Sequence, residues 1–181
     1  MASIADELAE RLAGFAPEPG EAAALHAMRG LLARGAAAFR RTEYEPGHFT
    51  ASAFVLSPEG DELLLIEHRT LRRWLQPGGH IEAVDATVLD AARRELREET
   101  GVTDAALLGG LFDLDVHLIP PGKAPAHRHF DLRFLFRAAN RALESSEEVR
   151  GARWCSLEEV SRLNTDESVV RAVRKLQARA R

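Results

Sequence analysis

Residues 78–102 constrain the fold of this chain most strongly, because they join a glycine loop to a long helix. The pair Gly78-Gly79 allows a sharp turn and a close approach of backbone. Apolar residues then recur at helical spacing over about 86–100, and Gly101 ends the helix as glycine commonly does. The apolar stripe comprises Leu89, Ala92 and Leu96, and the acidic residues beside it are Glu95, Glu98 and Glu99. We expect a helix that buries one stripe and presents an acidic edge next to it.

The three glutamates fall within about 100° of rotation around the helix axis. Like charges at this spacing repel by roughly a few tenths of a kcal/mol per pair, and by more at the border of a core, where the effective dielectric is lower. Two explanations are open at this point. The edge is either a solvated acidic face or a site for a hard divalent cation such as magnesium, which binds carboxylates together with substrate phosphates.

The remaining pattern predicts an α/β (α+β) fold with a hairpin and later strands. Two apolar runs at 49–56 and 62–67 flank Ser57-Pro-Glu-Gly-Asp61, whose proline and glycine suit a tight turn. Residues 129–137 alternate between apolar and polar side chains, as in a strand that buries one face. A short strand at 152–155 and two helices complete the chain.

The first 42 residues differ in pattern from the rest of the chain and indicate helices. Apolar residues recur at helical spacing over about 4–15 and 21–40, and Pro17-Glu-Pro-Gly20 separates the two runs. We assign residues 1–42 to an N-terminal helical extension and residues 43–181 to the main domain. Simple packing on the main domain is one role for the extension, and formation of a homodimer or a lid is the alternative.

Composition excludes several classes of protein. At 181 residues with 45% hydrophobic content, the chain suits one globular domain with an appendage. Its formal net charge of −4 argues against nucleic-acid binding through bulk charge, and its single cysteine permits no intrachain disulfide. The start of the chain lacks the basic lead and apolar run of a signal peptide, and no apolar run approaches the ~20 residues that span a membrane. We expect a cytoplasmic protein with no membrane partner.

The segment Arg94-Glu-Leu-Arg-Glu-Glu-Thr-Gly-Val102 resembles the second half of the Nudix hydrolase signature. In that signature Arg-Glu, an aliphatic residue, one further residue, Glu-Glu, one further residue, Gly and an aliphatic residue follow one another, and all of these positions match. Gly79 matches the first glycine of the signature, and residues 75–80 are similar to its usual lead-in. The resemblance extends over about residues 48–165. It implies a Nudix-type αβα sandwich with a mixed central sheet.

The first half of the signature departs from the family pattern. Asp85 stands in the slot reached by counting five residues on from Gly79, where the family has glutamate, and eight residues rather than seven separate Asp85 from Arg94. Counting back from Arg94 places Ala86 in the glutamate position. A one-residue insertion accounts for both differences. Asp85 then takes the missing role with a shorter reach, which would weaken one metal site.

The resemblance also implies roles for individual residues. Glu98 and Glu99 would be the main ligands of Mg²⁺ or Mn²⁺, and Glu95 a further ligand or the base for an attacking water. Gly79 and Asp85 are placed with the metal contacts. Arg94 would orient Glu95 through an ion pair. Many members use an extra glutamate from a late loop as base or ligand, and Glu148 is the candidate here, with a charged surface loop as the alternative.

The implied reaction is metal-dependent hydrolysis of the diphosphate bond in a nucleoside diphosphate linked to another group X. The alternative is a Nudix-fold ligand-binding or sensor module with weak turnover, which the Asp85 departure motivates; an RNA-end processing enzyme is disfavoured by the negative charge. Diadenosine polyphosphates are disfavoured because the tyrosine expected past the signature is missing. ADP-ribose is weakly supported by Pro120 and Pro121, which lie near the family's proline position.

Two further groups of polar residues lie outside the signature. Arg69, with its neighbouring arginines, either meets substrate phosphate or lies in a solvated loop. His129, Asp131 and Arg133 share one side of the predicted strand, where they either line the substrate site or face solvent. His117 and His127, together with His129, also suggest a structural zinc site, but the sequence shows no fourth ligand and no cysteine for it.

Overall fold

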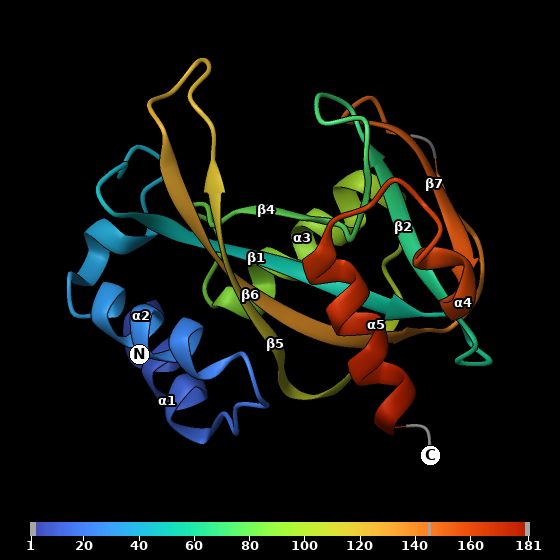
Figure 1. Cartoon of the computed structure of the whole chain (residues 1–181), viewed down its shortest axis with the longest axis horizontal. Helices are drawn as coiled ribbons and strands as arrows, with labels where there is room; N and C mark the ends of the chain where they lie inside the picture. Colours follow the sequence, from blue (N-terminus) through green and yellow to red (C-terminus); the bar gives the residue numbers. More distant parts are fainter. Residues whose placement is uncertain (1–2, 145, 180–181) are drawn as a thin grey trace. The chain divides into compact units, whose positions relative to one another are not determined.

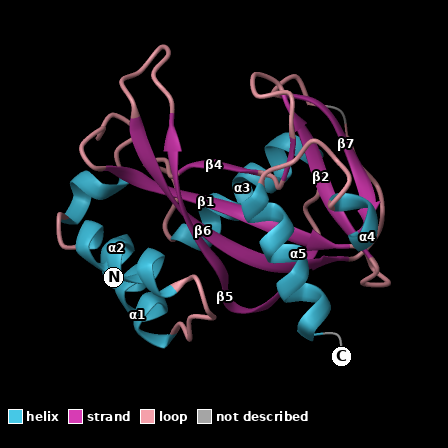
Figure 2. Cartoon of the chain, in the orientation of Figure 1, coloured by secondary structure: helices cyan, strands magenta, loops and turns pink. Residues whose placement is uncertain are grey.

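The computed structural model describes residues 3–144 and 146–179, which form a mixed α/β fold with N-terminal helices and a mixed central sheet (Figures 1 and 2). The helices are α1 (Ile4–Gly14), α2 (Ala22–Leu32), the 3₁₀ helix η1 (Gly35–Phe39), α3 (Val88–Thr100), α4 (Leu157–Val160) and α5 (Glu167–Arg179). The strands are β1 (Gly47–Leu56), β2 (Glu62–His68), β3 (Trp74–Leu75), β4 (Gly78–His80), β5 (Ala105–Ile119), β6 (His127–Ala138) and β7 (Val149–Ser156).

The sheet has the strand order β3-β2-β1-β6-β5, with β4 paired to β1 and β7 paired to β2. By its contacts the chain divides into two compact units. Unit 1 comprises the chain up to Ser52 with Gly78–Ala92 and Gly109–Phe134, and unit 2 comprises Ala53–Pro77, Arg93–Leu108 and the chain from Leu135 onward.

The N-terminal helices of unit 1 confirm the expected helical start and correct its length. Ser3 caps α1 through a reciprocal pair of hydrogen bonds with Asp6, and the helix buries Leu8 and Leu12. The second helix was expected to continue to about residue 40 but ends at Leu32. Gly35 has a φ of +64°, a left-handed conformation that stops an α-helix, and the chain continues as the short 3₁₀ helix.

The sheet of unit 1 depends on a close approach between β1 and β4. The two strands are antiparallel, with Thr50 opposite His80 and Ser52 opposite Gly78. A Cβ at Gly78 would lie 2.3 Å from the Cβ of Ser52, so only glycine fits there. This contact is the close backbone approach that the glycine pair predicts.

Unit 2 is built on β2. The expected hairpin is present, with Leu56 of β1 opposite Leu63 of β2, and β7 pairs along β2 from Glu62↔Ser156 onward. The residues Leu63–Ile66 are all buried. Trp74 and Leu75 of β3 pair with Glu67 and Ile66. The end of β2 and the start of β7 therefore lie side by side.

Helix α3 begins and ends close to its expected bounds. Thr87 caps its start, since the Thr87 hydroxyl accepts a hydrogen bond from the Asp90 amide at 3.0 Å. Gly101 ends it with a φ of +75°, and its amide donates to the carbonyl of Arg97 at 2.8 Å. No helix in the described part of the chain has the length and apolar character needed to cross a membrane.

Candidate active site

Three carboxylates converge in unit 2. Glu95 and Glu98 come from α3, where residues three apart share a face, and Glu148 comes from the loop that precedes β7. One carboxylate oxygen of each lies within 4.8 Å of those of the other two. The structure therefore brings the late-loop glutamate to two of the three signature glutamates, although 50 residues separate Glu148 from Glu98 in the sequence.

Arg94 holds two members of this cluster. Its Nη1 donates to Oε1 of Glu95 and to Oε2 of Glu98, both at 2.9 Å. The side chains of Arg94 and Glu95 are only 11% and 12% exposed, so this ion pair is largely protected from solvent. The ion pair expected between Arg94 and Glu95 is thus present, and Glu98 shares it.

The environment of Glu95 shifts the pKa of its carboxyl upward. Burial raises the pKa of Glu95 above its ordinary value, and the hydrogen bond and positive charge of Arg94 oppose this rise. The negative charges of Glu98 and Glu148 raise the pKa of Glu95 further. A positive charge placed among the three carboxylates would relieve this repulsion.

Glu99 occupies a different environment from its neighbours on the helix. It is buried, with 7% of its surface exposed, whereas Glu98 is exposed. In the described part of the chain, the carboxylates gathered within 4.8 Å are those of Glu95, Glu98 and Glu148, and Glu99 is not one of these three. Its expected role as a main metal ligand stays a prediction.

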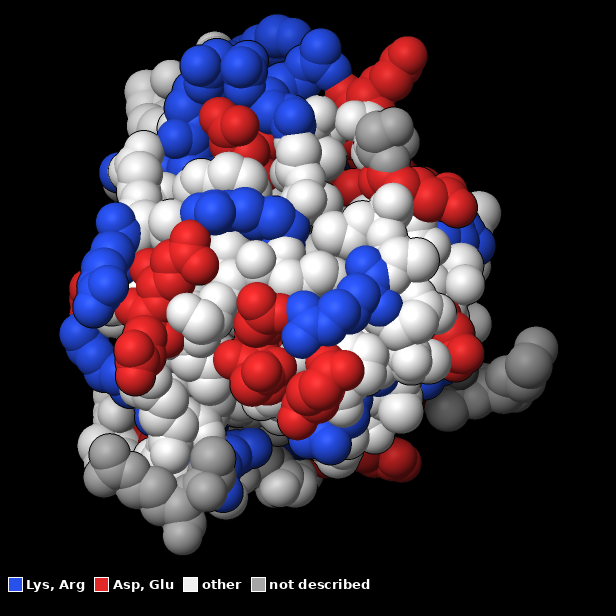
Figure 3. All heavy atoms as spheres, turned by 90° about the vertical axis from the view of Figure 1, so that its right-hand side faces the viewer, with Lys and Arg blue, Asp and Glu red and all other residues white. Residues whose placement is uncertain are grey.

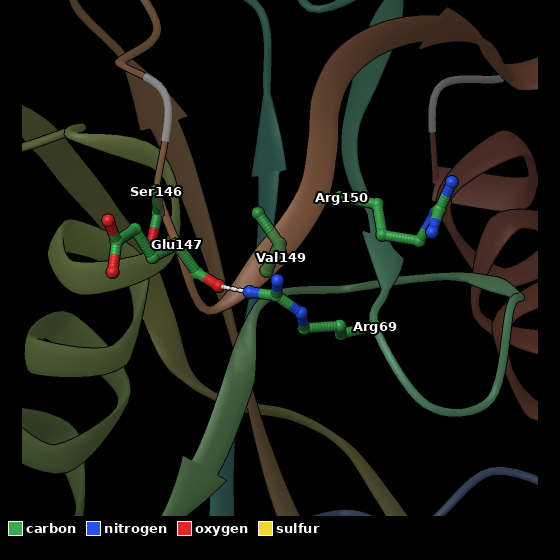
Figure 4. Close-up of a pocket in the computed structure, with 5 residues that line it drawn as sticks. All are labelled: Arg69, Ser146, Glu147, Val149 and Arg150. Carbon is green, nitrogen blue, oxygen red and sulfur yellow. Dashed lines mark hydrogen bonds between the residues drawn. The ribbon is translucent and has the colours of Figure 1, made fainter.

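An open pocket of about 500 Å³ is lined by residues on both sides of Glu148 in the sequence. It is lined by Arg69, Ser146, Glu147, Val149 and Arg150, so Glu148 sits in the middle of the lining segment. Figure 4 shows the Arg69 guanidinium turned toward the main chain of Glu147, whose carbonyl accepts its hydrogen bond. Figure 3 views the right-hand side of Figure 1 and shows Lys and Arg side chains gathered at its upper end. In Figure 1 the loop between β2 and β3 lies at this end.

Arg150 is a residue of this pocket that the sequence analysis missed. It lies on β7, two residues after Glu148, and forms an ion pair of 3.3 Å with Glu67 of β2. Arg72 approaches the same Glu67 carboxylate at 3.7 Å. The signal for Arg150 in the sequence was its position two residues after Glu148. Because β2 and β7 are paired, this position brings it to the end of β2 that leads into the Arg69 loop.

Asp85 and Gly79 belong to unit 1. The Asp85 carboxylate accepts from the Glu82 amide at 2.8 Å, and the Asp85 amide donates to the Glu82 carbonyl at 3.1 Å. Asp85 therefore closes a turn shortly before α3. Gly79 lies in β4 opposite Ala51 of β1. The metal contacts expected for both residues stay predictions.

The polar residues predicted on β6, His129, Asp131 and Arg133, are also in unit 1, and the last two of them are buried. Arg133 is 1% exposed and bonds Asp131 at 2.8 Å and Asp113 at 3.1 Å, with Asp115 at 3.4 Å. Thr50 and Ser52 of β1 donate to the Asp131 carboxylate. Asp131 and Arg133 therefore do not form a solvent side of the sheet, which was one of the two expectations for them. Their substrate contacts, and those of the half-buried His129, stay predictions.

Comparison with known proteins places these features in a family. A family model of the Nudix domain matches residues 46–176. A relative described as a probable DHNTP pyrophosphohydrolase, from Lactococcus lactis subsp. cremoris, is 36% identical over 101 residues. The match covers 54% of this chain and 58% of the relative, so the chain spans less than two thirds of that relative's length.

Solved structures share the fold. A Nudix-family hydrolase from Clostridium perfringens is 26% identical with a TM-score of 0.56, over 72% of this chain and 97% of that one. The Ap4A hydrolase of C. elegans, in a binary complex, is 19% identical with a TM-score of 0.57, over 72% of this chain and 95% of that one. The matched model spans most of the chain, including the signature segment that carries Glu95 and Glu98. The chain belongs to the Nudix domain family.

Proposed function

We propose that this protein hydrolyses the diphosphate bond of a nucleoside diphosphate linked to another group X, with the help of Mg²⁺ or Mn²⁺. The observation that carries this proposal is the convergence of Glu95 and Glu98 of the signature helix with Glu148. Family membership supports the reaction class, since relatives are named as acting on DHNTP and on Ap4A.

The donor set suits a hard divalent cation. All three groups offer carboxylate oxygens, which are the ligands that Mg²⁺ and Mn²⁺ prefer over nitrogen or sulfur. Two donors are on helix α3, and the third directly precedes strand β7. A cation bound there would offset the charge of the substrate phosphates and activate a water for attack.

Residues of the chain perform the rest of the work. Arg94 fixes the carboxylates of Glu95 and Glu98 at 2.9 Å and so limits their rotamers. Arg69 and Arg150 line the pocket to which both sequence neighbours of Glu148 contribute, and guanidinium groups bind phosphate oxygens well. The raised pKa of Glu95 suits a group that takes up a proton from water. The substrate phosphates would lie between the carboxylate cluster and these arginines.

A hydrolysis screen with Mg²⁺ and with Mn²⁺ tests the proposal, with the monophosphate products detected as phosphate after alkaline phosphatase treatment and pyrophosphate detected after pyrophosphatase treatment. The panel holds nucleotide sugars, dinucleotides, nucleoside triphosphates and DHNTP, the compound in the name of the Lactococcus relative. We expect metal-dependent turnover of at least one compound. Tight binding of one compound with no turnover of any would instead favour the sensor module.

Glu98→Gln is the matched variant for the site. It keeps the shape of the side chain and removes its charge, and loss of one charge-stabilising group in an active site costs roughly 100-fold to 1,000-fold in kcat. The control is Glu158→Gln, an exposed glutamate of α4. Near-full activity of Glu98→Gln would overturn the assignment. Glu99→Gln tests separately whether the buried glutamate contributes.

A further inference from the structure

Five of the seven histidines of the chain gather in unit 1, in a cluster that contains none of the three carboxylates of the candidate active site. His129 is at the centre of the group. Its ring centroid lies 4.9 Å from that of His48, 5.2 Å from His80, 5.1 Å from His127 and 5.5 Å from His117. Histidine is the commonest metal ligand among protein side chains, so a cluster of this density calls for a chemical explanation.

His48 has an unsatisfied nitrogen inside this cluster. The side chain is fully buried, and its Nδ1 lies 3.0 Å from the carbonyl of Glu43, to which it can only donate. The Nε2 atom is then an acceptor, and it has no hydrogen-bond partner among the described residues. A buried acceptor with no partner is costly, and native proteins rarely leave one without a reason.

The same arrangement is how proteins prepare a metal-binding imidazole. In a ligating histidine, the ring nitrogen that does not bind the metal commonly donates its N–H hydrogen bond to a backbone carbonyl. This bond fixes the tautomer and directs the lone pair of the other ring nitrogen at the metal. His127 shows a similar bond, with its Nδ1 2.7 Å from the carbonyl of Pro125. Its Nε2 lies 3.3 Å from Nε2 of His129.

Three of the histidines offer ligand atoms that lie close together. A ring nitrogen of each of His48, His80 and His129 lies within 4.8 Å of those of the other two. They come from three strands, β1, β4 and β6. The antiparallel pairing of β1 with β4, in which Thr50 lies opposite His80, fixes two of these strands relative to one another.

We propose that His48, His80 and His129 bind a zinc-class transition metal ion. Three neutral imidazoles with an open fourth position form a tetrahedral donor set that suits zinc. Nitrogens on one tetrahedral zinc are about 3.3 Å apart, so a bound ion would draw these ring nitrogens, which lie within 4.8 Å of one another, closer together.

This site differs in kind from the carboxylate cluster of unit 2. Imidazole nitrogen favours zinc, copper and nickel, whereas carboxylate oxygen favours magnesium and manganese. The proposal therefore does not rest on the proposed hydrolase function. The two can fail separately, because zinc binding is measured without substrate.

Metal content of the full chain, purified without a histidine tag and stripped with a chelator, tests the inference. We expect about one zinc per chain after reconstitution, measured by inductively coupled plasma mass spectrometry. Co²⁺ in place of zinc should give the visible absorption bands of a tetrahedral site. Wild-type protein that binds neither metal after dialysis would overturn the proposal and leave a metal-free histidine cluster.

Variants assign the ligands. His80→Gln and His129→Gln should each weaken zinc binding at least about tenfold, because even partners of ligands change metal affinity by that factor. The control is His26→Gln, on the exposed side of α2, which should bind zinc like the wild type. Circular dichroism identifies any variant that fails to fold, and two independent variants keep the test decisive. Unchanged zinc affinity in both would refute the assignment.

Discussion

At the scale of single residues, Arg94 shows how one nitrogen atom organises the candidate active site. Its Nη1 contacts both Glu95 and Glu98, and the Arg94–Glu95 pair is about nine-tenths buried on both sides. Arg94→Ala leaves the Glu95 carboxylate without this partner and should lower the free energy of unfolding by about 1–3 kcal/mol. Guanidinium chloride unfolding measures the change.

Arg94→Lys sharpens this prediction. Because a single nitrogen makes both contacts, a lysine ammonium should restore part of the stability that alanine loses. Arg97→Ala is the control, since Arg97 is 58% exposed and meets Glu98 at 3.6 Å, a geometry worth less than about 0.5 kcal/mol. Equal losses in Arg94→Ala and Arg97→Ala would contradict the role given to Arg94.

His68 predicts a pH dependence for the turn that carries Arg69. Its Nδ1 accepts from the amides of Thr70 and Leu71, so protonation there would break both bonds. Burial lowers the pKa of His68 below 6.5. As the pH falls, the unfolded chain therefore takes up a proton at His68 before the folded chain does. The stability that neutral His68 contributes is complete above pH 6.5 and is lost as the pH falls below it.

The measurement is urea unfolding of wild type and His68→Gln between pH 8 and pH 5. The difference between the two free energies of unfolding isolates His68 from the other histidines. We expect wild type to be the more stable at pH 8, by at most about 1 kcal/mol, and the difference to shrink toward pH 5. A constant difference across this range would show that His68 does not titrate in the turn.

The sequence predicted the site residues on the helix more fully than the site residues that strand pairing brings in from other parts of the chain. Helical spacing placed Glu95, Glu98 and Glu99 on one edge, and the family resemblance pointed to a late-loop glutamate, for which Glu148 was the candidate. The cluster holds Glu95, Glu98 and Glu148. Arg150 escaped notice because its place beside the pocket depends on the pairing of β7 with β2. His48 escaped for a similar reason, since its separation from His129 is bridged only in the folded sheet. Long-range pairing, unlike periodicity, leaves little trace in a single sequence.

At the scale of secondary structure elements, β4 depends on Gly78. An added Cβ would lie 2.3 Å from the Cβ and 2.8 Å from the Cα of Ser52, and neither neighbour is the flexible end of a side chain. Gly78→Ala should lower the free energy of unfolding by about 1–3 kcal/mol or more, since overpacked sites cost this much. Chemical denaturation is the measurement.

Gly110 supplies the matched control for Gly78. It also lies in a strand, β5, and a Cβ there would meet nothing within 4 Å. Gly110→Ala should therefore change the free energy of unfolding by less than about 0.5–1 kcal/mol, in the stabilising direction. If both alanine variants lose the same stability, the close approach of β1 and β4 is not what selects glycine at position 78.

Strand β6 shows why element type was easier to predict than environment. Its alternation predicted a strand correctly, but the polar side holds Asp131 and Arg133, which are 4% and 1% exposed. Arg133 contacts three aspartate carboxylates, one of them that of Asp131, and two hydroxyl groups donate to Asp131. This part of the polar face is therefore buried as well. The pattern identifies the two faces of a strand, and only the fold shows whether each face is covered.

At the scale of the whole molecule, residues 3–144 and 146–179 include two candidate metal sites with opposite ligand preferences, one made of carboxylates in unit 2 and one made of imidazoles in unit 1. A metal that binds the folded chain but not the unfolded chain raises the free energy of unfolding by RT ln(1 + [L]/Kd), where [L] is the free metal concentration. The rise is about 1.4 kcal/mol when [L] is tenfold above Kd. For a chain of this size that corresponds to a rise in Tm of about 3–6 °C.

The rise should depend on the metal and on the variant. Magnesium should stabilise wild type and His129→Gln but not Glu98→Gln, because hard Mg²⁺ binds poorly to an all-nitrogen site. Low zinc concentrations should stabilise wild type and Glu98→Gln but not His129→Gln. Differential scanning fluorimetry of the three proteins with each metal gives the six values. Loss of both responses in one variant would mean that the two sites are not separate, since independent sites contribute additively to the free energy of unfolding.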